Sequence, residues 1–360
     1  MITGSPGVRG QYANDFMISD FVLAKGYAFA STDKGNSGPQ FSRAEFYPDG
    51  KTPGSAIHEW HERVRELAIA AKGAAEAYYG EEPHRTYVTG ISNGGYLTRY
   101  ALENNADLYD GGVDLEGTLF LSEGPNLLTF LPAAIKHYWP YLKAVWVLQN
   151  SKDKDELEEA QAEIDRTRAA ITAAGFAPGS EFLWAYHYGV YWQSTQRIYR
   201  QEFDPDYKGL EENYDYAQRI QQVPNIKEGM ERVSLTGDIR KPLITLHGTL
   251  DTLFPIKKDF DDDTGLINSD KYAQLIQEKG RSRLHRYYKI EGGTHVDGLY
   301  DHAGFREKLR PMLPCYRAAF DRLVEWVEEE KLPPDNKTIL KPGDKEDYVV
   351  NCCPELEEQE

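Results

Sequence analysis

The sequence predicts an α/β protein with a mostly parallel central sheet flanked by helices. Short apolar segments of strand length alternate along the chain with longer segments of helical periodicity, which is the order that a parallel sheet requires. The chain has 360 residues. Because a typical domain has about 150 residues, this length leaves room for a sizeable core and for an insertion or a second domain.

The first half of the chain is expected to contain the strands Gly26–Ser31 and Thr86–Thr89, with a helix over residues 55–79 between them. Apolar residues recur in this helix at spacings of three and four. They give it one apolar face, made of Ile57, Trp60, Val64, Leu67, Ala68 and Ala71. A glycine and a proline shortly after residue 79 end the helix. Another helix is expected to follow the second strand and to extend to about Asn104.

The second half continues this alternation. One strand is expected within Gly111–Leu121, and two more at Pro242–Leu246 and Leu284–Ile290. A last helix is expected at about 315–330. Its core-facing residues are Tyr316, Ala319, Phe320, Leu323, Val324 and Val327.

Between about 125 and 236 the composition changes, because a charged helix at Asp153–Ala174 lies between aromatic-rich stretches. Four of the six tryptophans fall in this block, which favours a structured helical insertion over a linker. We therefore expect a discontinuous α/β core formed by residues 1–124 and 237–345, a cap at 125–236 and a tail at 346–360. The chain is rich in Pro, Lys and Glu from residue 331 onward, which favours an extended tail.

Composition excludes several kinds of partner. Apolar residues make up 40% and charged residues 28% of the chain, as in a folded globular protein. The formal net charge is −17, and we find no run of Lys and Arg. Nucleic acids and anionic lipids both require clustered basic residues, so neither is expected as a partner.

Cysteines and apolar runs give little further information. The three cysteines, Cys315, Cys352 and Cys353, form no C-x-x-C pair, so we expect one buried thiol and two tail thiols rather than a zinc site or disulfides. No apolar run is long enough to span a membrane, and Met1–Gly10 does not have the pattern of a signal peptide. These features predict a cytoplasmic location, although a secreted form trimmed at its N-terminus would look the same.

The candidate nucleophile is Ser92, in the G-x-S-x-G sequence Gly90–Gly94. A predicted strand precedes this sequence and a predicted helix follows it directly. A serine on so sharp a turn has a strained backbone and projects its hydroxyl away from the sheet. The start of the helix behind it offers N–H groups and a favourable dipole for an oxyanion. An unreactive glycine-rich turn is the alternative interpretation.

A serine hydroxyl needs a base, and the base needs an acid that orients it. On this kind of turn the order along the chain is serine, acid, histidine. Asp251 follows the strand at Pro242–Leu246, and His295 follows the strand at Leu284–Ile290. These two residues are the predicted acid and base.

Other acidic and histidine side chains compete for the roles of acid and base. His247 lies at a strand end and is expected to pack the loop that carries Asp251, whereas His58, His61, His84 and His285 have the patterns of ordinary surface or core residues. Asp297 and Asp301 follow His295 but lack a preceding strand. The acidic run at 259–263 does not have EF-hand spacing, so no metal site is expected there.

Acyl transfer also requires two N–H donors for the oxyanion. One is expected to be the backbone N–H of Asn93, directly after the nucleophile. The other should come from the glycine-rich loop Ile2–Gly10, the only such loop near an early strand. Pro6 has no N–H, so Ser5 is the first choice for this second donor.

Taken together, these segments resemble the α/β-hydrolase superfamily, over most of residues 1–124 and 237–335. Ser92-Asn-Gly-Gly95 with Leu108-Tyr-Asp-Gly-Gly112 is similar to tannase and feruloyl-esterase-like enzymes. Arg9-Gly-x-Tyr12, Thr32-Asp-Lys-Gly35, His247-Gly-x-x-Asp251-x-Leu253-x-Pro255 and Leu332-Pro-Pro334 resemble D-3-hydroxybutyrate oligomer hydrolases. The likeness implies an α/β-hydrolase fold and a serine esterase that uses Ser92, His295 and Asp251, without a cofactor.

Two departures limit what the resemblance implies. Tannase-type enzymes carry a disulfide between cysteines that directly precede the nucleophile and the histidine, where this chain has Ile91 and Thr294. The oligomer hydrolases are considerably longer chains, so their substrate does not transfer directly.

The sequence therefore predicts a carboxylic ester hydrolase that acts on a small-molecule ester of short-chain, hydroxyalkanoate or aromatic type. Cap aromatics could form the wall of the acyl pocket, and Trp184, Tyr188 and Trp192 are the residues chosen for this role. The alternative is that these aromatics form the cap's own core. A serine peptidase and a non-catalytic binding protein of the same fold remain alternative functions.

Overall fold

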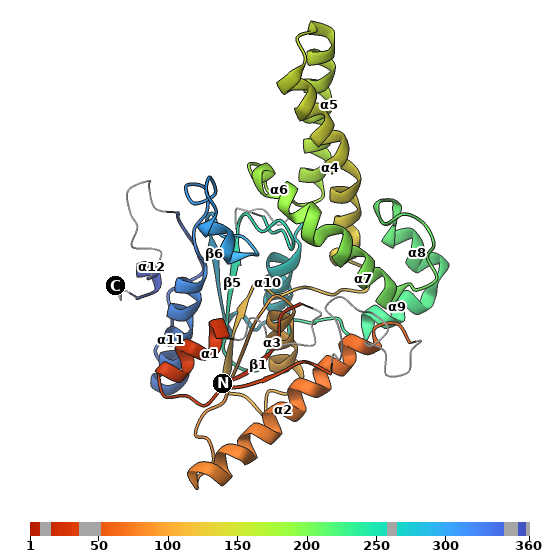
Figure 1. Ribbon diagram of the computed structural model, residues 1–360. Coiled ribbons are helices and arrows are strands. Elements are labelled where there is room, and N and C mark those ends of the chain that lie inside the picture. The colour runs from red at the N-terminus through yellow and green to blue at the C-terminus, as the bar shows by residue number, and fades with distance from the viewer. Residues whose placement is uncertain (8–15, 36–51, 258–264, 342–351, 358–360) are drawn as a thin grey trace.

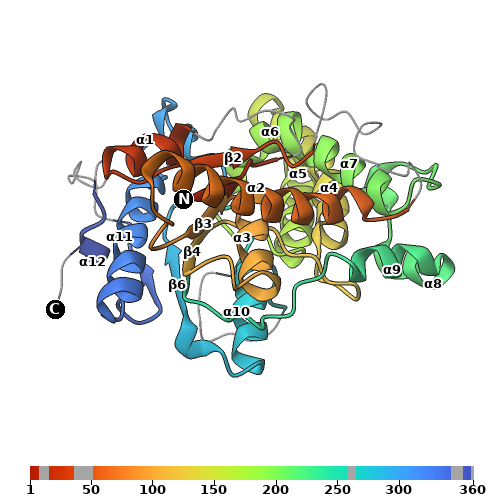
Figure 2. The same ribbon diagram turned by 90° about the horizontal axis from the view of Figure 1, so that it is seen from below.

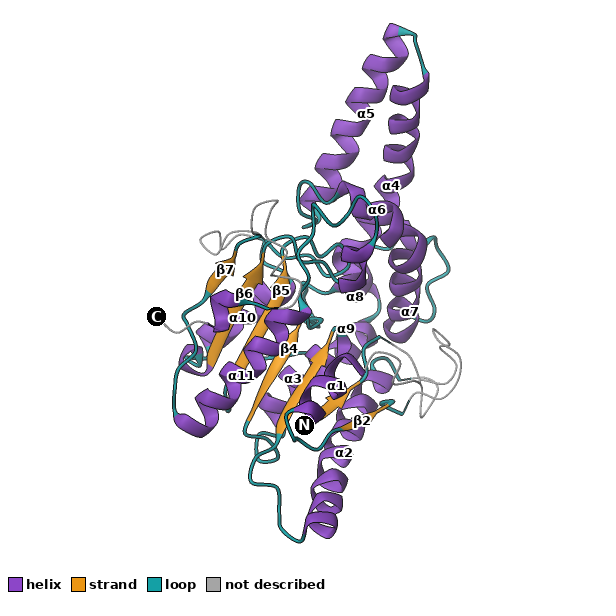
Figure 3. Cartoon of the chain, turned by 60° about the vertical axis from the view of Figure 1, so that its left-hand side comes forward, coloured by secondary structure: helices purple, strands orange, loops and turns teal. Residues whose placement is uncertain are grey.

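The computed structural model describes residues 1–7, 16–35, 52–257, 265–341 and 352–357. Its centre is a seven-stranded sheet with the strand order β2-β1-β3-β4-β5-β6-β7, in which each strand runs parallel to its neighbours (Figure 3). The strands are β1 (Ile2–Gly4), β2 (Ala30–Thr32), β3 (Tyr87–Ile91), β4 (Gly111–Leu115), β5 (Leu243–Gly248), β6 (His285–Ile290) and β7 (Lys337–Ile339). The predicted α/β class with a mostly parallel sheet is confirmed.

Helices cover both faces of the sheet (Figures 1 and 2). The core on one face includes residues of α2 (Ser55–Tyr79), α3 (Asn93–Asn104) and α10 (Asn268–Glu278). The core on the other face includes residues of α1 (Phe16–Ala24), α11 (Leu313–Glu329) and α12 (Pro354–Glu357). Since β3, β4 and β5 lie between neighbours, their residues are buried throughout, as the compact apolar segments predicted.

The predicted helix over residues 55–79 has the observed bounds of α2, and its buried residues include Ile57, Trp60, Val64 and Ala68. The strand expected at Gly26–Ser31 is shorter and later, at Ala30–Thr32. The strand expected within Gly111–Leu121 ends at Leu115, where Glu116 takes a positive φ of 54° and turns the chain out of the sheet.

Residues 125–236 form a helical segment that separates β4 from β5. It contains α4 (Leu127–Asn150), α5 (Lys154–Ala173), α6 (Glu181–His187), α7 (Gln193–Phe203), α8 (Tyr216–Gln222) and α9 (Pro224–Glu231). Helices α4 and α5 form a hairpin that projects away from the sheet (Figure 1). A π-helical turn at Tyr188–Trp192, called the π-turn below, connects α6 to α7 without a break in the helix.

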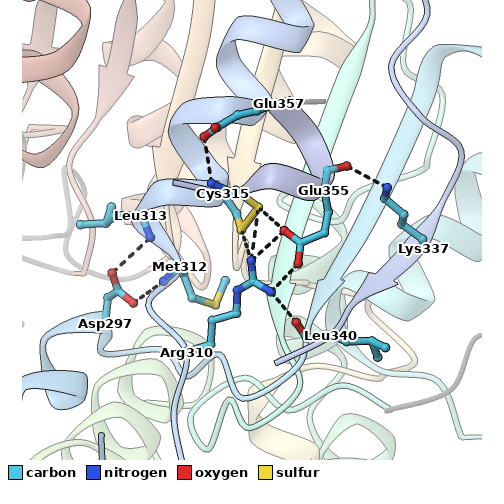
Figure 4. The surroundings of a disulfide bond; sticks show 10 residues. Asp297, Arg310, Met312, Leu313, Cys315, Lys337, Leu340, Glu355 and Glu357 are labelled. Carbon is cyan, nitrogen blue, oxygen red and sulfur yellow. Dashed lines mark hydrogen bonds and ion pairs between the residues drawn. A yellow bond between two sulfur atoms is a disulfide. The ribbon is translucent and has the colours of Figure 1, made fainter. Parts of the chain in front are cut away.

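The C-terminal segment corrects two predictions. Residues 331–360 are not simply an extended tail, because β7 pairs with β6 and α12 packs on the core that contains α11. Cys315 and Cys353 are buried and joined by a disulfide rather than being separate thiols (Figure 4). Cys352 is not part of this disulfide. Thirty-eight positions separate the two bonded cysteines, so the sequence contained no local spacing from which to predict their pairing.

Arg310 fixes the same segment beside the disulfide. Its buried guanidinium donates two hydrogen bonds of 2.9 Å to the Glu355 carboxylate and one to the carbonyl of Leu340 (Figure 4). The bidentate geometry holds α12 against the end of the sheet. Within the part of the chain that the structure describes, no helix is long and apolar enough to cross a membrane.

Candidate active site

Ser92 lies on the turn between β3 and α3, where the predicted strand–turn–helix context is observed. Its backbone has φ 60° and ψ −119°, a conformation that non-glycine residues rarely adopt. Hydrogen bonds hold it there: the Ser92 N–H donates to the Leu115 carbonyl of β4 at 2.9 Å, and its carbonyl accepts from the Tyr96 N–H at 3.0 Å. The strained turn is therefore fixed from the sheet and from the helix.

The positions that flank Ser92 require glycine, because other backbone atoms lie too close to leave room for a side chain. A Cβ atom on Gly90 would lie 2.3 Å from the backbone carbon of Gly94, and one on Gly94 would lie 2.4 Å from the carbonyl oxygen of Gly4. Both clashes involve backbone, so a side chain could not move away from them. The two flanking glycines of G-x-S-x-G thus allow β3, α3 and the loop after β1 to meet at Ser92.

The structure brings Ser92, His295 and Asp251 into one hydrogen-bonded chain. His295 Nε2 lies 3.0 Å from Ser92 Oγ, and His295 Nδ1 lies 2.9 Å from Asp251 Oδ2. Asp251 follows β5 and His295 follows β6, so both come from the carboxyl ends of strands, as does Ser92 after β3. The ring of Phe254 packs edge-on against the imidazole, with 4.9 Å between ring centroids.

Asp251 is buried and held by several donors. Its Oδ1 accepts the backbone N–H groups of Leu253 and Phe254 at 2.7 and 2.8 Å, and its Oδ2 lies 3.1 Å from His247 Nε2. Burial alone would raise the pKa of this carboxyl. Electrostatic attraction to His295 and the hydrogen bonds from both histidines outweigh burial and lower the pKa of this carboxyl below its usual value, so Asp251 is ionised.

His247 takes the supporting position that the sequence predicted, packed against the loop that carries Asp251. Its Nε2 faces two acceptors, Asp251 Oδ2 and the Phe254 carbonyl, so Nε2 carries the proton. Its Nδ1 lies 2.6 Å from Ser269 Oγ, which accepts a hydrogen bond from Arg99. A chain of buried polar groups therefore extends from Arg99 to Asp251 and fixes the orientation of the acid.

Asp297, the competing acid, is used elsewhere. Its carboxylate accepts the backbone N–H groups of Met312 at 2.6 Å and Leu313 at 3.2 Å, next to the start of α11 (Figure 4). No hydrogen bond between Asp297 and His295 is found among the described residues. The acidic run at 259–263, for which no metal site was expected, lies outside the described residues.

Glu116 is a site residue that the sequence analysis missed. It follows β4 directly, its side chain is 2% exposed, and its Oε2 lies 3.6 Å from His295 Nδ1. Burial and the charges of Asp251 and Asp297 raise the pKa of Glu116 well above its usual value. An acidic residue directly after a buried central strand was the available signal, and it is the same signal that identified Asp251.

The predicted oxyanion donors differ in their placement. Asn93 is the first residue of α3, where a backbone N–H has no acceptor within the helix, and it lines the pocket beside Ser92. Ser5 does not match its prediction, because its N–H donates to the Thr32 carbonyl of β2 at 3.3 Å. Pro6 and Gly7 line the pocket instead, and Gly7 is the first of these with an N–H.

Lys34 explains why Ser5 is held away from the pocket. This buried lysine donates to the Ser5 carbonyl and, at 2.8 Å, to the Ser5 hydroxyl, and its ammonium lies 5.2 Å from the ring centre of Trp60. Thr32-Asp-Lys-Gly35, singled out in the sequence, thus fixes the loop after β1. Residues 8–15, which contain the rest of the glycine-rich loop, lie outside the described residues.

A cavity of about 270 Å³ opens over Ser92 and His295. Its walls come from the carboxyl ends of the strands, from α1 and α11, and from the π-turn and α7. Four residues of the helical segment 125–236 line it: Tyr191, Thr195, Ile198 and Tyr199. Along the chain they are spaced by four, three and one residues, as on one face of a helix. The lining residues that the structure describes include no Lys or Arg.

Trp184, Tyr188 and Trp192 do not line this cavity, which corrects the prediction for all three. Both tryptophan side chains are fully buried, and their indole N–H groups donate to Ser180 Oγ and to the Thr252 carbonyl, respectively. Tyr188 stacks on Tyr138 with 4.4 Å between ring centroids. The alternative interpretation, that such aromatics are the core of the helical segment, therefore applies to them.

One group of described residues has the composition of a metal site. Ligand atoms of Glu116, Asp251 and His295 all lie within 4.8 Å of one another. A cation there would compete with the Asp251–His295 hydrogen bond, so the same atoms cannot hold a metal and orient the imidazole at once.

Comparisons with protein-family models and with curated proteins found no match. Among solved structures, the chain is similar to feruloyl esterase B from Aspergillus oryzae, with 16% identity and a TM-score of 0.57, over 91% of this chain and 75% of that chain. It is also similar to tannin acyl hydrolase from Aspergillus niger, with 14% identity and a TM-score of 0.51, over 91% of this chain and 73% of that chain. At these identities the likeness establishes the fold, which is the α/β-hydrolase fold that the motifs predicted.

Proposed function

We propose that this protein is a serine hydrolase of carboxylic esters, with Ser92 as nucleophile, His295 as base and Asp251 as the acid that orients the base. The hydrogen-bonded chain from Ser92 through His295 to Asp251, on a strained turn at the floor of a cavity, is the observation that supports it most strongly. The two solved structures compared above, a feruloyl esterase and a tannin acyl hydrolase, bear the names of hydrolases.

The reaction would proceed in two halves. Ser92 Oγ attacks the ester carbonyl while His295 Nε2 takes the hydroxyl proton, and the carbonyl oxygen becomes an oxyanion. Collapse of this tetrahedral intermediate breaks the bond to the alcohol, which leaves with the proton from His295, and an acyl-enzyme remains. Water then attacks the acyl-enzyme with His295 again as base, which releases the acid and restores Ser92. Asp251 stabilises the imidazolium in both halves.

For the oxyanion hole we propose the backbone N–H groups of Asn93 and Gly7. Asn93 adjoins the nucleophile at the start of α3, and Gly7 lines the same cavity from the loop after β1. Gly7 replaces Ser5 in this assignment, because the Ser5 N–H already donates to the Thr32 carbonyl.

The lining of the cavity favours esters with uncharged, apolar or aromatic acyl groups. Ile91, Leu115, Ile198 and Leu253 offer apolar contact, and Tyr191 and Thr195 bring hydroxyl groups. Glu116 and Asp297 are the acidic residues of the lining, and no described lining residue would neutralise a carboxylate on the substrate. A hydroxybutyrate oligomer with a free terminal carboxylate is therefore a poorer fit than a neutral ester.

A substrate panel tests this proposal. We expect turnover of p-nitrophenyl esters of short acids and of methyl ferulate, and faster turnover of a methyl-esterified hydroxybutyrate oligomer than of the same oligomer with its carboxylate free. Aminoacyl anilides should be inert. Efficient anilide cleavage without ester cleavage would contradict the esterase proposal and favour a peptidase.

The neighbours Tyr191 and Trp192 provide a matched test of how substrates are selected. Tyr191 lines the cavity and Trp192 is buried on the other face of the helix. Tyr191→Ala should change relative kcat/KM across the ester panel by about tenfold, since it removes one pocket wall. Trp192→Ala should leave the relative values unchanged and lower the free energy of unfolding by about 3–5 kcal/mol. If both variants had the parent's ester profile, this helix face would not select substrates.

For the location of the protein we propose an oxidising compartment. The Cys315–Cys353 disulfide favours an oxidising compartment, because such bonds are rare in the cytosol. This preference opposes the cytoplasmic location expected from the sequence.

A further inference from the structure

His295 is approached by two carboxyl groups rather than one. Asp251 Oδ2 lies 2.9 Å from Nδ1 and makes the hydrogen bond, whereas Glu116 Oε2 lies 3.6 Å from the same nitrogen and does not. The two acids come from different parts of the sheet, since Glu116 follows β4 and Asp251 follows β5. The mechanism proposed above uses Asp251 and leaves Glu116 without a task.

The Glu116 carboxyl is held in place independently of Asp251. The backbone N–H of Gly248, at the end of β5, donates to Glu116 Oε1 at 3.2 Å, and the Glu116 N–H donates to the Leu246 carbonyl at 2.9 Å. These bonds leave Oε2 as the oxygen that faces the imidazole. A small movement of one oxygen would therefore bring it within hydrogen-bonding distance of Nδ1.

The charged groups around Glu116 determine its protonation state. Burial raises its pKa most, followed by the negative charges of Asp251 and Asp297, and Asp114 adds to them, while the Gly248 N–H acts in the opposite direction. Asp251 is the largest of these charges in effect. Burial and the charge on Asp251 thus disfavour ionisation of Glu116, and the loss of the charge on Asp251 would favour it.

We propose that Glu116 is a positioning residue for His295, a reserve acid whose Oε2 accepts the hydrogen bond from the Nδ1–H when Asp251 cannot. The proposal rests on the proposed function, in which His295 is the base. Ionisation of Glu116 is favoured when the charge on Asp251 is lost, so its carboxyl can face His295 as an anion when the first acid is absent. A purely structural Glu116 would instead only hold the end of β5 through Gly248.

A double-mutant cycle separates these roles, with kcat/KM for p-nitrophenyl acetate as the measurement. The Glu116→Gln side chain retains an oxygen that can accept the Gly248 N–H, but it cannot become an anion. We expect Glu116→Gln to lower activity by a factor about ten times larger in the Asp251→Asn background than in the parent enzyme. Equal factors in the two backgrounds would overturn the proposal.

Asp297→Asn in the Asp251→Asn background is the matched control. Asp297 is half-buried and also lies near the base, but its oxygens accept the N–H groups of Met312 and Leu313. Its substitution should not lower activity by a larger factor in the Asp251→Asn background than in the parent, because the loss of its charge there favours ionisation of Glu116. If Asp297→Asn showed the same background dependence as Glu116→Gln, general electrostatics rather than a reserve acid would explain the result, and the proposal would fail.

A spectroscopic measurement tests the same idea without any substrate. The Nδ1 proton of a histidine bonded to a carboxylate gives a low-field proton NMR signal, which can be assigned here by its absence from His295→Gln. We expect this signal to persist in Asp251→Asn and to disappear in Asp251→Asn/Glu116→Gln, with both variants folded by their melting temperatures. Its loss already in Asp251→Asn would refute the proposal. If no ester is hydrolysed, this measurement still decides the role of Glu116, so the two failures can be distinguished.

Discussion

Ser92→Ala is expected to lower kcat for ester hydrolysis by about 10⁴-fold or more while the protein remains folded. The substitution removes the attacking oxygen and little else. Alanine accommodates the φ of 60° about as well as serine does, and the hydrogen bonds of Ser92 to Leu115 and Tyr96 are made by the backbone. Steady-state kinetics on a p-nitrophenyl ester, with circular dichroism and melting temperature as controls, measures the effect.

Covalent labelling gives an independent check of the nucleophile. A serine-directed organophosphonate should modify Ser92 in the parent protein, and no serine in Ser92→Ala, as detected by mass spectrometry of peptides. Near-parental turnover in Ser92→Ala, or labelling of another serine, would show that the nucleophile lies elsewhere.

Asp251→Asn is expected to lower kcat by about 10²-fold or more at neutral pH, because an amide favours the wrong tautomer of His295 and cannot stabilise the imidazolium. The residual activity should exceed that of Ser92→Ala, since Glu116 remains 3.6 Å from Nδ1. The same substitution at Asp297 should cost far less activity and should instead lower stability, because the N–H groups of Met312 and Leu313 lose a charged acceptor. Parallel kinetics and melting of the two variants measure this ranking. The opposite order of activities would mean that Asp297 orients the base.

The central features of the site could be predicted because each has a local signal. Ser92, Asp251 and His295 all follow a buried strand, and a parallel sheet brings the carboxyl ends of its strands to one edge. Apolar runs and glycine-rich turns were therefore enough to select these residues. Helix α2 was equally accessible, since its period is visible in the sequence and a glycine and a proline follow its last residue.

Features that depend on contacts between residues distant in the sequence could not be predicted from such local signals. The choice of Ser5 as an oxyanion donor is wrong because its N–H pairs with Thr32, a partner on another strand. The disulfide joins Cys315 to a residue 38 positions away, which no spacing rule connects. Glu116 meets His295 only through the packing of three strands, although its place after β4 was visible.

The choice of Trp184 and Trp192 as pocket residues is wrong for a different reason. Aromatic density shows that a segment packs against something, but not which face of the helix meets the cavity. Trp184 lies in α6 and Trp192 is the last residue of the π-turn, which changes the angular relation between α6 and α7. A regular helical period therefore does not predict which residues of this run share a face.

The π-turn also has an evolutionary consequence. It amounts to one residue more than a continuous α-helix would need between α6 and α7, and Gly189 within it has no atom within 4 Å of its Cβ position. Deleting one residue there would restore regular helical hydrogen bonding and rotate α7 by about 100° about its axis relative to α6. Thr195, Ile198 and Tyr199 would then turn away from the cavity together. Relatives of this protein could therefore exchange an entire pocket wall through a single-codon deletion or insertion, without any substitution among the residues that form it.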